Sequence, residues 1–445
     1  MRKALVRLVV LWLAFALVAA SCGGDDDTAD AGGNGAGTVP ASEIDYEAIG
    51  LWDDGPCDET REPLKVGLMT VFESPVVSLE DQALALEAAA EAFNSRGGAN
   101  GACIEVTTCD DGANPDQAVA CVREIDEAGV VATVNDQGLA AQAEVSEAMA
   151  AAGIPRVATN VANNDWGDPN AYPLDASGTG VTFLMPRALI DAGVTEIAAI
   201  RVGQPEAAAL MTILEGIYGE EASFPADIPV PAGTTDFSQF ILAAQESGAE
   251  GAFMALGEQE AVQVIRAGQQ LGTDLRIGAS LGSFSHSNVV DMGDFADRLV
   301  FLWSFAPPTA DLPVYDAMRA DLAASGEESL QPEHLKASPV RSWIGLYALI
   351  RMIRDADMTE FTREGITAML KEAEDVPMLD MFGGHDWTPD QDHPGVWSRA
   401  GIDRWVIYEW DPDAEGVFEG NFVQTGEFSF DEVMCGSPFG APEPC

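Results

Sequence analysis

The sequence predicts an α/β protein built from two doubly wound, Rossmann-like parallel sheets. Short apolar segments typical of buried strands alternate with longer segments of helical periodicity, and this alternation runs through two successive series. No internal repeat at a solenoid period is present. Strands that alternate with helices form parallel sheets covered on both faces, because each return to the same edge of a sheet needs a crossover.

The first series begins with a strand at 64–69 and a helix at 80–96, in which Ala and Leu recur at helical spacing. Pro115 follows Asn114 at another helix start, a place where the first turn tolerates proline. The remaining elements alternate in the same way. They are strands at 103–109, 130–134 and 156–158 and helices at 114–128 and 142–152.

The second series repeats this pattern and ends in an aromatic, strand-rich tail. Its strands are 196–202, 251–256 and 276–279, and its helices are 181–192, 206–218, 238–248 and 260–271. The last part of the chain contains strands at 301–303, 404–408 and 418–422 and helices at 313–324, 340–356 and 363–372.

The amino terminus predicts export. Basic residues precede an apolar run over 8–20 that is too short for a comfortable membrane span, as in a secretory signal over 1–21. The run closes on Ala19-Ala20-Ser21-Cys22, which resembles a bacterial lipobox, so Cys22 is the expected lipidated residue. An ordinary signal with an incidental Cys22 is the alternative. Residues 22–60 are poor in apolar side chains and are expected to form a flexible, lipid-anchored tether.

The formal net charge of −51 excludes nucleic acid as a partner, because phosphate would be repelled. Most of the Asp and Glu residues are expected on a solvated surface. The seven cysteines leave six once Cys22 is set aside, an even number that favours disulfides in an oxidising compartment. Local spacing favours Cys109–Cys121 and Cys435–Cys445, and elimination leaves Cys57–Cys103, although six cysteines allow fifteen pairings.

Several segments together resemble the type I periplasmic binding proteins of the branched-chain amino acid (Leu/Ile/Val-binding) ABC importer family. The resemblance covers nearly all of 63–430, and it depends on the order and spacing of the segments. They are Lys65-Val66-Gly67-Leu68, the helix end 92–98 with Asn100-Gly101, the stretch 109–115, Thr235-Asp236-Phe237-Ser238, Gly248-Ala249-Glu250 and Leu271-Gly272.

The resemblance implies two lobes joined by three chain crossings, with a ligand in the cleft and hinge closure around it. The expected first lobe is 61–176 with 305–377, the second is 177–304 with 378–430, and 431–445 is a tail. It also implies that the protein is not an enzyme, uses no cofactor, and delivers a small solute to an ABC permease and ATPase complex. We expect a monomer at the outer face of the cytoplasmic membrane or in the periplasm, anchored by its lipid.

Ligand contacts are expected in the loops that follow the strands, because ligands of doubly wound sheets bind at the carboxyl ends of strands. Polar or aromatic side chains occupy these positions in both series. The candidates are Phe72, Ser74, Asn135, Gln137, Thr159 and Asn160 in the first series and Gln204, Glu258, Phe284 and Trp303 in the second. Core packing is the alternative role for Phe72 and Trp303.

Two features depart from the amino acid binders that the sequence resembles. The family grips the ligand carboxylate with Ser or Thr hydroxyls where this chain has Leu139, Ala140 and Ala141. The family also presents a carboxylate to the ligand ammonium, whereas the aligned stretch 279–282 contains no acid. We therefore expect a ligand other than a standard α-amino acid, with an apolar, amide-like or aromatic character.

Arg341 and Trp343 lie near a helix start that faces the cleft in relatives, where Arg341 could engage an acid or form a surface salt bridge. A ligand-sensing lipoprotein of the same fold is an alternative function. A metal-dependent hydrolase that uses the loop from His385 to His393, with Asp386, Asp390 and Asp392, is another, but these residues lie in a loop-like segment, and no metal site is expected there.

Overall fold

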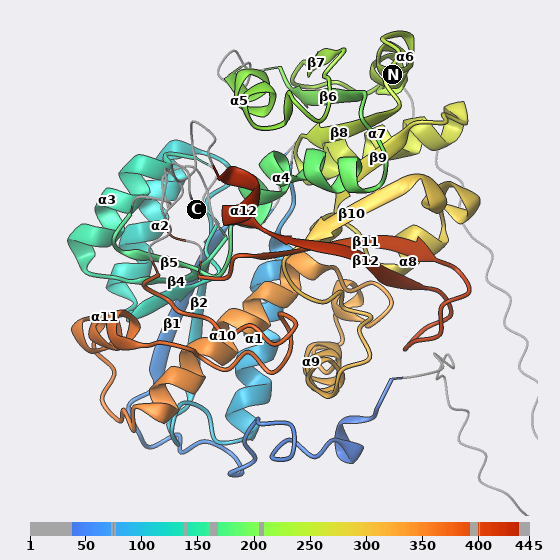
Figure 1. Cartoon of the computed structure of the whole chain (residues 1–445). Helices are drawn as coiled ribbons and strands as arrows, with labels where there is room; N and C mark the ends of the chain where they lie inside the picture. Colours follow the sequence, from blue (N-terminus) through green and yellow to red (C-terminus); the bar gives the residue numbers. More distant parts are fainter. Residues whose placement is uncertain are drawn as a thin grey trace, which may run out of the picture. The chain divides into compact units, whose positions relative to one another are not determined.

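The computed structural model describes residues 38–72, 74, 77–137, 140–160, 168–203, 209–391, 399 and 401–435, without the side chains of Thr179 and Glu258. The predicted signal, Cys22 and Cys445 therefore lie outside the described residues. The described part has two sheets flanked by helices (Figure 1), which confirms the predicted fold class. Within it, no helix is both long enough and apolar enough to cross a membrane.

The first sheet has five parallel strands in the order β2-β1-β3-β4-β5. Helices α2 and α3 enclose one small core against this sheet, and α1 and α10 contribute to the main core. The strands are β1 (Leu64–Thr70), β2 (Ile104–Asp110), β3 (Ala132–Val134), β4 (Arg156–Thr159) and β5 (Ala171–Pro173). The helices are α1 (Glu80–Ser95), α2 (Pro115–Glu127), α3 (Gln142–Ala152), α9 (Pro313–Ala323), α10 (Ala337–Asp355) and α11 (Arg363–Glu372).

The second sheet has seven strands in the order β12-β11-β10-β9-β8-β6-β7. It is parallel from β7 to β10, and β11 and β12 add an antiparallel hairpin to its edge. The strands are β6 (Ile197–Val202), β7 (Asp227–Val230), β8 (Gly251–Ala255), β9 (Arg276–Ser280), β10 (Leu299–Trp303), β11 (Arg404–Asp411) and β12 (Asn421–Ser429). The helices are α4 (Ser177–Asp191), α5 (Ala209–Tyr218), α6 (Ser238–Glu246), α7 (Glu258–Leu271), α8 (His286–Val290) and α12 (Phe430–Met434).

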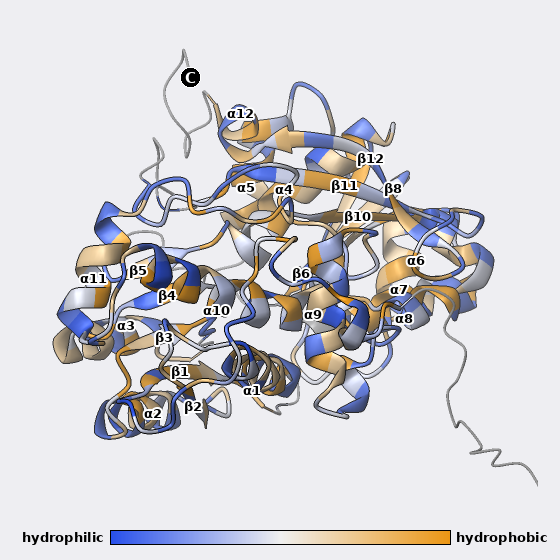
Figure 2. Cartoon of the chain, turned by 90° about the horizontal axis from the view of Figure 1, so that it is seen from below, coloured by the Kyte–Doolittle hydropathy of each residue, from blue (hydrophilic) through white to orange (hydrophobic). Residues whose placement is uncertain are grey.

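The chain crosses from one sheet, with its flanking helices, to the other three times. The first crossing joins β5 to α4, the second joins β10 to α9, and the third joins α11 to β11. Figure 2 shows hydrophobic and hydrophilic residues on the same helices, as in α1 and α9, which fits helices with one face on the core and one in solvent.

Three sequence expectations need correction. The strand expected at 418–422 begins only at Asn421 and runs to Ser429, because Gly420 (φ 76°) forms part of the hairpin turn. The short strands β5 and β7 were not predicted. Each lies at a sheet edge and contains a proline, and proline lacks the N–H that an interior strand must donate.

The third correction concerns the amino-terminal segment, which packs on α1 and α10 instead of remaining a flexible tether up to residue 60. Trp52 is buried, with its ring 5.4 Å from Phe93 and stacked on Tyr347 at 6.2 Å. The Arg354 guanidinium lies 4.4 Å from the centre of the Trp52 ring. A tryptophan buried in this way holds the segment around it in place.

Two of the three predicted disulfides are confirmed, namely Cys57–Cys103 and Cys109–Cys121, with Cα separations of 5.0 and 5.7 Å. The first attaches the amino-terminal segment beside β2, and the second joins β2 to α2. Cys435 is also disulfide-bonded, and its pairing with Cys445 stays a prediction, because Cys445 is not among the described residues.

Gly345 lets α10 approach the first sheet closely. A Cβ added at this position would lie 2.9 Å from the Ala158 Cβ and 3.0 Å from a Val134 methyl, both fixed on strands. We expect Gly345→Ala to lower the free energy of unfolding by about 1–3 kcal/mol, as overpacked core sites do. Urea denaturation followed by circular dichroism measures this change.

Gly178→Ala is the matched control. Gly178 also lies in a helix, but a Cβ there would meet nothing within 4 Å. This variant should keep or slightly raise stability, because alanine favours helices by about 1 kcal/mol over glycine. Equal stability of the Gly345→Ala variant and the wild type would contradict the close approach of α10.

Candidate functional site

The strand order of each sheet defines a place where ligands bind in doubly wound folds. In the first sheet β1 lies between β2 and β3, and in the second β6 lies between β7 and β8. The helical connections therefore leave in opposite directions at these strands, and ligands of doubly wound folds bind outside the carboxyl ends of such strands. The sequence candidates follow β1, β3 and β4 in one sheet and β6, β8, β9 and β10 in the other.

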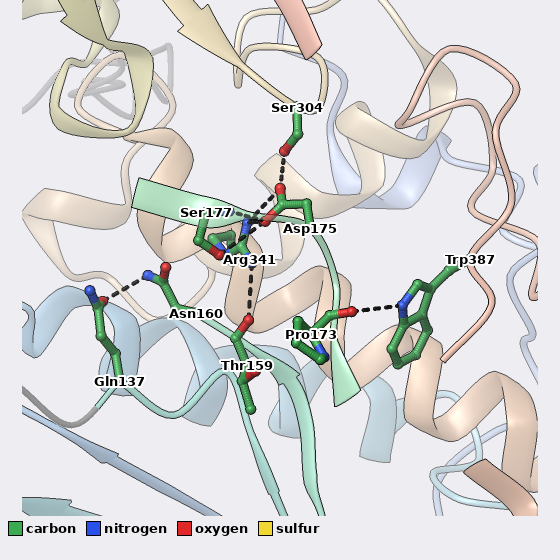
Figure 3. A network of polar contacts seen from close by, with 9 residues as sticks. All are labelled: Gln137, Thr159, Asn160, Pro173, Asp175, Ser177, Ser304, Arg341 and Trp387. Atoms are coloured by element: carbon green, nitrogen blue, oxygen red, sulfur yellow. Dashed lines mark hydrogen bonds and ion pairs between the residues drawn. The ribbon is translucent and has the colours of Figure 1, made fainter. Parts of the chain in front are cut away.

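Three of the predicted residues belong to one cluster of amide side chains. Gln137 Oε1 accepts a hydrogen bond from Asn160 Nδ2 at 2.7 Å (Figure 3). It also accepts one from Gln82 Nε2 at 3.4 Å. Asn135 Nδ2 donates to Ser342 Oγ at 2.9 Å, and Ser342 Oγ donates to the Gln82 backbone oxygen at 2.8 Å. Asn135, Gln137 and Asn160 thus meet at the ends of β3 and β4.

Sequence reasoning missed Gln82 and Ser342, which reach this cluster from α1 and α10. Both side chains are buried, although helix residues of their types are usually exposed. A buried polar side chain near a helix start, facing the ends of the strands, is the signal that points to them. In the sequence this signal is weak, because burial depends on how α1 and α10 pack.

Beside this cluster lies a buried ion pair, which we call the crossing clasp and define as Asp175, Ser177, Ser304 and Arg341. Arg341 Nη1 contacts both Asp175 carboxylate oxygens, at 2.8 and 2.9 Å, and both residues are fully buried. Arg341 Nη2 donates to Ser177 Oγ at 2.9 Å. Ser304 Oγ donates to Asp175 from the end of β10 (Figure 3).

The clasp joins the first two crossings to α10 and to the candidate ligand loop. Asp175 and Ser177 belong to the first crossing, and Ser304 opens the second. Arg341 Nη2 also reaches the backbone oxygen of Thr159 at 3.4 Å. Both interpretations of Arg341 from the sequence are wrong. Its guanidinium is buried and pairs with Asp175, so it neither forms a surface salt bridge nor is free for an acidic ligand. Trp343 likewise points elsewhere, donating to Asp321 at 2.9 Å.

The third crossing is tied to the first by Trp387. Its indole Nε1 donates to the Pro173 backbone oxygen at 3.1 Å, and the ring is fully buried. A Cβ on Gly401 would overlap this ring, so the glycine is needed there. Trp387 therefore has a structural role in the segment that the sequence left open as a hydrolase loop.

In that segment, Asp390 pairs with Arg399, while His393 lies outside the described residues. Across the residues that the structure describes, no group of three or more His, Cys, Asp or Glu side chains is arranged to hold a metal ion.

Three residues with a positive φ lie at or near these strand ends. Asn135 (φ 54°), Ala158 (φ 50°) and Ser177 (φ 47°) all adopt the left-handed conformation, which disfavours residues with a Cβ. At Ala158 the pairing of β4 with β5 shifts register. Such strain persists only where the surrounding packing enforces it, as Gly345 and the clasp do here.

Trp303 and Phe305 form an aromatic group at the second crossing. Their rings lie 5.4 Å apart, edge to face, and Phe305 contacts Phe382 at 5.5 Å. Trp303 is 3% exposed, and its indole N–H has no hydrogen-bond partner. Gly282 lies against this ring, because a Cβ there would come within 2.5 Å of it.

The other candidates lie apart from the amide cluster or outside the described residues. Phe72 is half-buried. The Ser74 hydroxyl donates to the Val77 backbone oxygen and accepts from the Val77 backbone N–H within the same loop. Phe284 is packed in the core with its ring 5.7 Å from Phe301. Gln204 and the side chain of Glu258 lie outside the described part, although both positions follow strands at the switch point of the second sheet.

Asp81 and Lys336 lie at the amino-terminal ends of α1 and α10, close to the amide cluster. Burial raises the pKa of the Asp81 carboxyl, and the Lys336 nitrogen, 3.7 Å away, offsets part of this effect. The cations at these strand ends each face a carboxylate. The pairs are Lys336 with Asp81, Arg156 with Asp136 at 2.8 Å, and Arg341 with Asp175.

Several solved structures resemble this fold. A fatty acid ABC transporter substrate-binding protein from Thermomonospora curvata matches with a TM-score of 0.69 and 15% identity, over 88% of this chain and 97% of the other. An ABC transporter solute-binding protein from R. palustris, solved with 4-hydroxybenzoate, matches with a TM-score of 0.66 and 17% identity, over 83% and 97%. Another from R. palustris, solved with benzoate, matches with a TM-score of 0.63 and 13% identity, over 86% and 98%.

At these identities the solved structures establish the fold alone, and a search of curated protein sequences finds no match. Family membership is settled by the sequence itself. The sequence profile of the periplasmic binding protein family matches residues 63–414, which is most of the chain. The protein therefore belongs to the periplasmic binding protein family.

Proposed function

We propose that the protein captures a small organic solute between its two sets of strand ends and delivers it to an ABC importer. The observation that carries this proposal is the pair of switch points, one in each sheet, within a chain of the periplasmic binding protein family. Closure of two lobes around a solute is a population shift that a membrane partner can sense. The names of the similar solved structures support a role in ABC transport.

The proposed contacts with the solute come from the amide cluster and the aromatic group. Asn135, Gln137 and Asn160 supply groups that can donate or accept hydrogen bonds, and Trp303 supplies an apolar face. Thr159 adds a hydroxyl at the end of β4. Phe284 is left out of this site, because its ring packs in the core.

The solute is proposed to be other than a standard α-amino acid. Ala140 and Ala141 carry no hydroxyl for a ligand carboxylate, and the stretch 279–282 carries no acid for an ammonium. The names of similar structures mention fatty acid transport, benzoate and 4-hydroxybenzoate. None of these compounds is an α-amino acid.

We also propose export and anchoring through Cys22, supported by the signal-like amino terminus. Residues between Cys22 and the packed segment that contains Trp52 would then form the connection to the membrane.

A thermal-shift screen of the purified protein tests capture. The panel should contain amino acids, amides, aromatic acids and other small nutrients. We expect at least one compound to raise the melting temperature, since a ligand at about 100 times its Kd stabilises the folded state by about 2.7 kcal/mol. Leucine and valine should give no shift. Stabilisation by either would contradict the proposed ligand class, and a panel without any hit would contradict capture.

Asn160→Ala should weaken binding of the solute found in that screen by about tenfold, the effect of losing roughly 1–1.5 kcal/mol of hydrogen bonding. Isothermal titration calorimetry measures the affinity. Asn170→Ala is the matched control, because Asn170 donates to the Ile154 backbone at the opposite end of the same sheet. Unchanged affinity in Asn160→Ala would show that the solute binds elsewhere.

The crossing clasp is proposed to hold the first two crossings in register for closure. Arg341→Met should lower the free energy of unfolding by about 3–5 kcal/mol, because it leaves the buried Asp175 carboxylate without its cation. Chemical denaturation measures this change. Adding Asp175→Leu to Arg341→Met should recover part of the loss, since the second substitution removes the unpaired charge. If the double variant were less stable than the single one, the pair would not act as a unit.

A further inference from the structure

Several polar atoms at the candidate site are buried and lack any hydrogen-bond partner. They include Gln82 Oε1, Asn135 Oδ1, Thr159 Oγ1 and Asn160 Oδ1. Their residues are at most 5% exposed and lie on β4, at the carboxyl ends of β3 and β4, or at the start of α1. Each unpaired buried group costs about 1–3 kcal/mol, so a cluster of them calls for a physical reason.

The hydrogen bonds around Asn135 identify its unpaired oxygen as an acceptor, and the Thr159 hydroxyl can donate or accept. The Ser342 hydroxyl gives its proton to the Gln82 backbone oxygen, so it can only accept from Asn135, whose amide nitrogen must then face it. The Asn135 oxygen is left over. Gln137 Oε1 receives the amide groups of both Asn160 and Gln82, which leaves their two oxygens unpaired as well. Figure 3 shows the Asn160 nitrogen toward Gln137 and its oxygen directed away.

The same site has no spare positive charge among its described residues. Arg341 Nη1 contacts both carboxylate oxygens of Asp175, Arg156 faces Asp136, and Lys336 lies beside Asp81. A buried carboxylate needs a cation or several donors to offset its desolvation. The formal charge of −51 also opposes the approach of an anion.

Two N–H donors also remain unpaired. Trp303 Nε1 is buried without a partner, and the next residue, Ser304, is tied to Asp175 of the clasp. Arg341 Nε, whose guanidinium pairs with Asp175 through Nη1, is the other. The unpaired groups therefore include three amide oxygens, one hydroxyl, one indole N–H and one guanidinium N–H. A carboxamide matches this set, because its N–H groups can donate to the amide oxygens while its oxygen accepts from the indole.

We infer that the solute is an uncharged compound that presents N–H or O–H donors, such as a carboxamide, to the unpaired oxygens of Gln82, Asn135 and Asn160. The inference rests on the proposed solute-binding function and names the class of its cargo. It sets this protein apart from the similar structures solved with benzoate and 4-hydroxybenzoate.

Matched sets of ligands test the charge of the cargo. Benzamide, benzoate and benzylamine share one scaffold, and isobutyramide, isobutyrate and isobutylamine share another. We expect the amide of at least one set to bind at least tenfold more tightly than its carboxylate, measured by calorimetry at low and high salt. A carboxylate or an amine that binds best in both sets overturns the inference.

If neither set binds, the inference is tested by the charge of the solute identified in the thermal-shift screen. An anionic or cationic solute overturns it. Absence of any ligand in that screen removes the proposed function itself. The two failures are therefore distinguishable.

Gln82→Met keeps the side-chain volume and removes the unpaired Oε1 together with the Nε2 hydrogen bond to Gln137 at 3.4 Å. Stability without ligand should fall by no more than this one long hydrogen bond contributes, whereas affinity for the amide should fall about tenfold. Thr159→Val, a second isosteric change, removes a hydroxyl that the empty protein does not use, so it should leave stability unchanged or higher and lower the affinity by a similar factor. Stability and affinity that fall together in both variants would assign these groups a structural role and overturn the inference.

Gln269→Met and Thr133→Val are the matched controls. Gln269 donates to the Met292 backbone at 3.0 Å, and Thr133 donates to Asp136 at 3.0 Å, so both polar groups are already paired. These variants should lose stability and keep their affinity for the amide. A tenfold loss of affinity in either control would show that the assay reports general damage, and the inference would then lose its support.

Discussion

The arrangement of the site depends on the buried pair of Arg341 and Asp175. Two charges removed from water are stabilising only when their geometry is good and their remaining groups are bonded. Here the carboxylate receives hydrogen bonds from Ser177 and Ser304 as well as from the guanidinium, which also reaches the Thr159 backbone. These partners come from two crossings, a strand end and α10, so the pair fixes all of them at once.

Most strands and helices could be predicted from the sequence, because their patterns are local. Apolar runs, proline at a helix start and glycine at a helix end sufficed for elements such as β1, α2 and α3. The edge strands β5 and β7 could not be found in this way, since three or four residues with a proline give almost no periodic signal. Burial of Trp52 was also invisible, because its partners Phe93 and Tyr347 are distant in sequence.

From the sequence, only those site residues could be placed whose position follows from the order of the parallel strands. Placing Asn135, Gln137 and Asn160 after successive parallel strands predicts that they meet, and they do. Gln82 and Ser342 complete the cluster from helices, and Asp175 lies 166 residues from Arg341. Such partners follow from the packing of α10 on β4, which Gly345 permits. No spacing rule connects them, and this is why neither interpretation of Arg341 from the sequence included Asp175.

Charged and neutral groups have different roles at the site, because the empty protein must stay folded while some of its buried polar groups lack a partner. A binding protein is stable without its cargo, so the groups kept for the cargo stay unpaired for much of its life. An unpaired amide oxygen costs about 1–3 kcal/mol, whereas an unpaired buried charge costs several times more. The described charges at these strand ends are accordingly paired with one another and hold the crossings together, as in Arg341 with Asp175. The unpaired atoms include the neutral amide oxygens of Asn135 and Asn160, and a neutral cargo satisfies these without introducing a charge that nothing at the site balances.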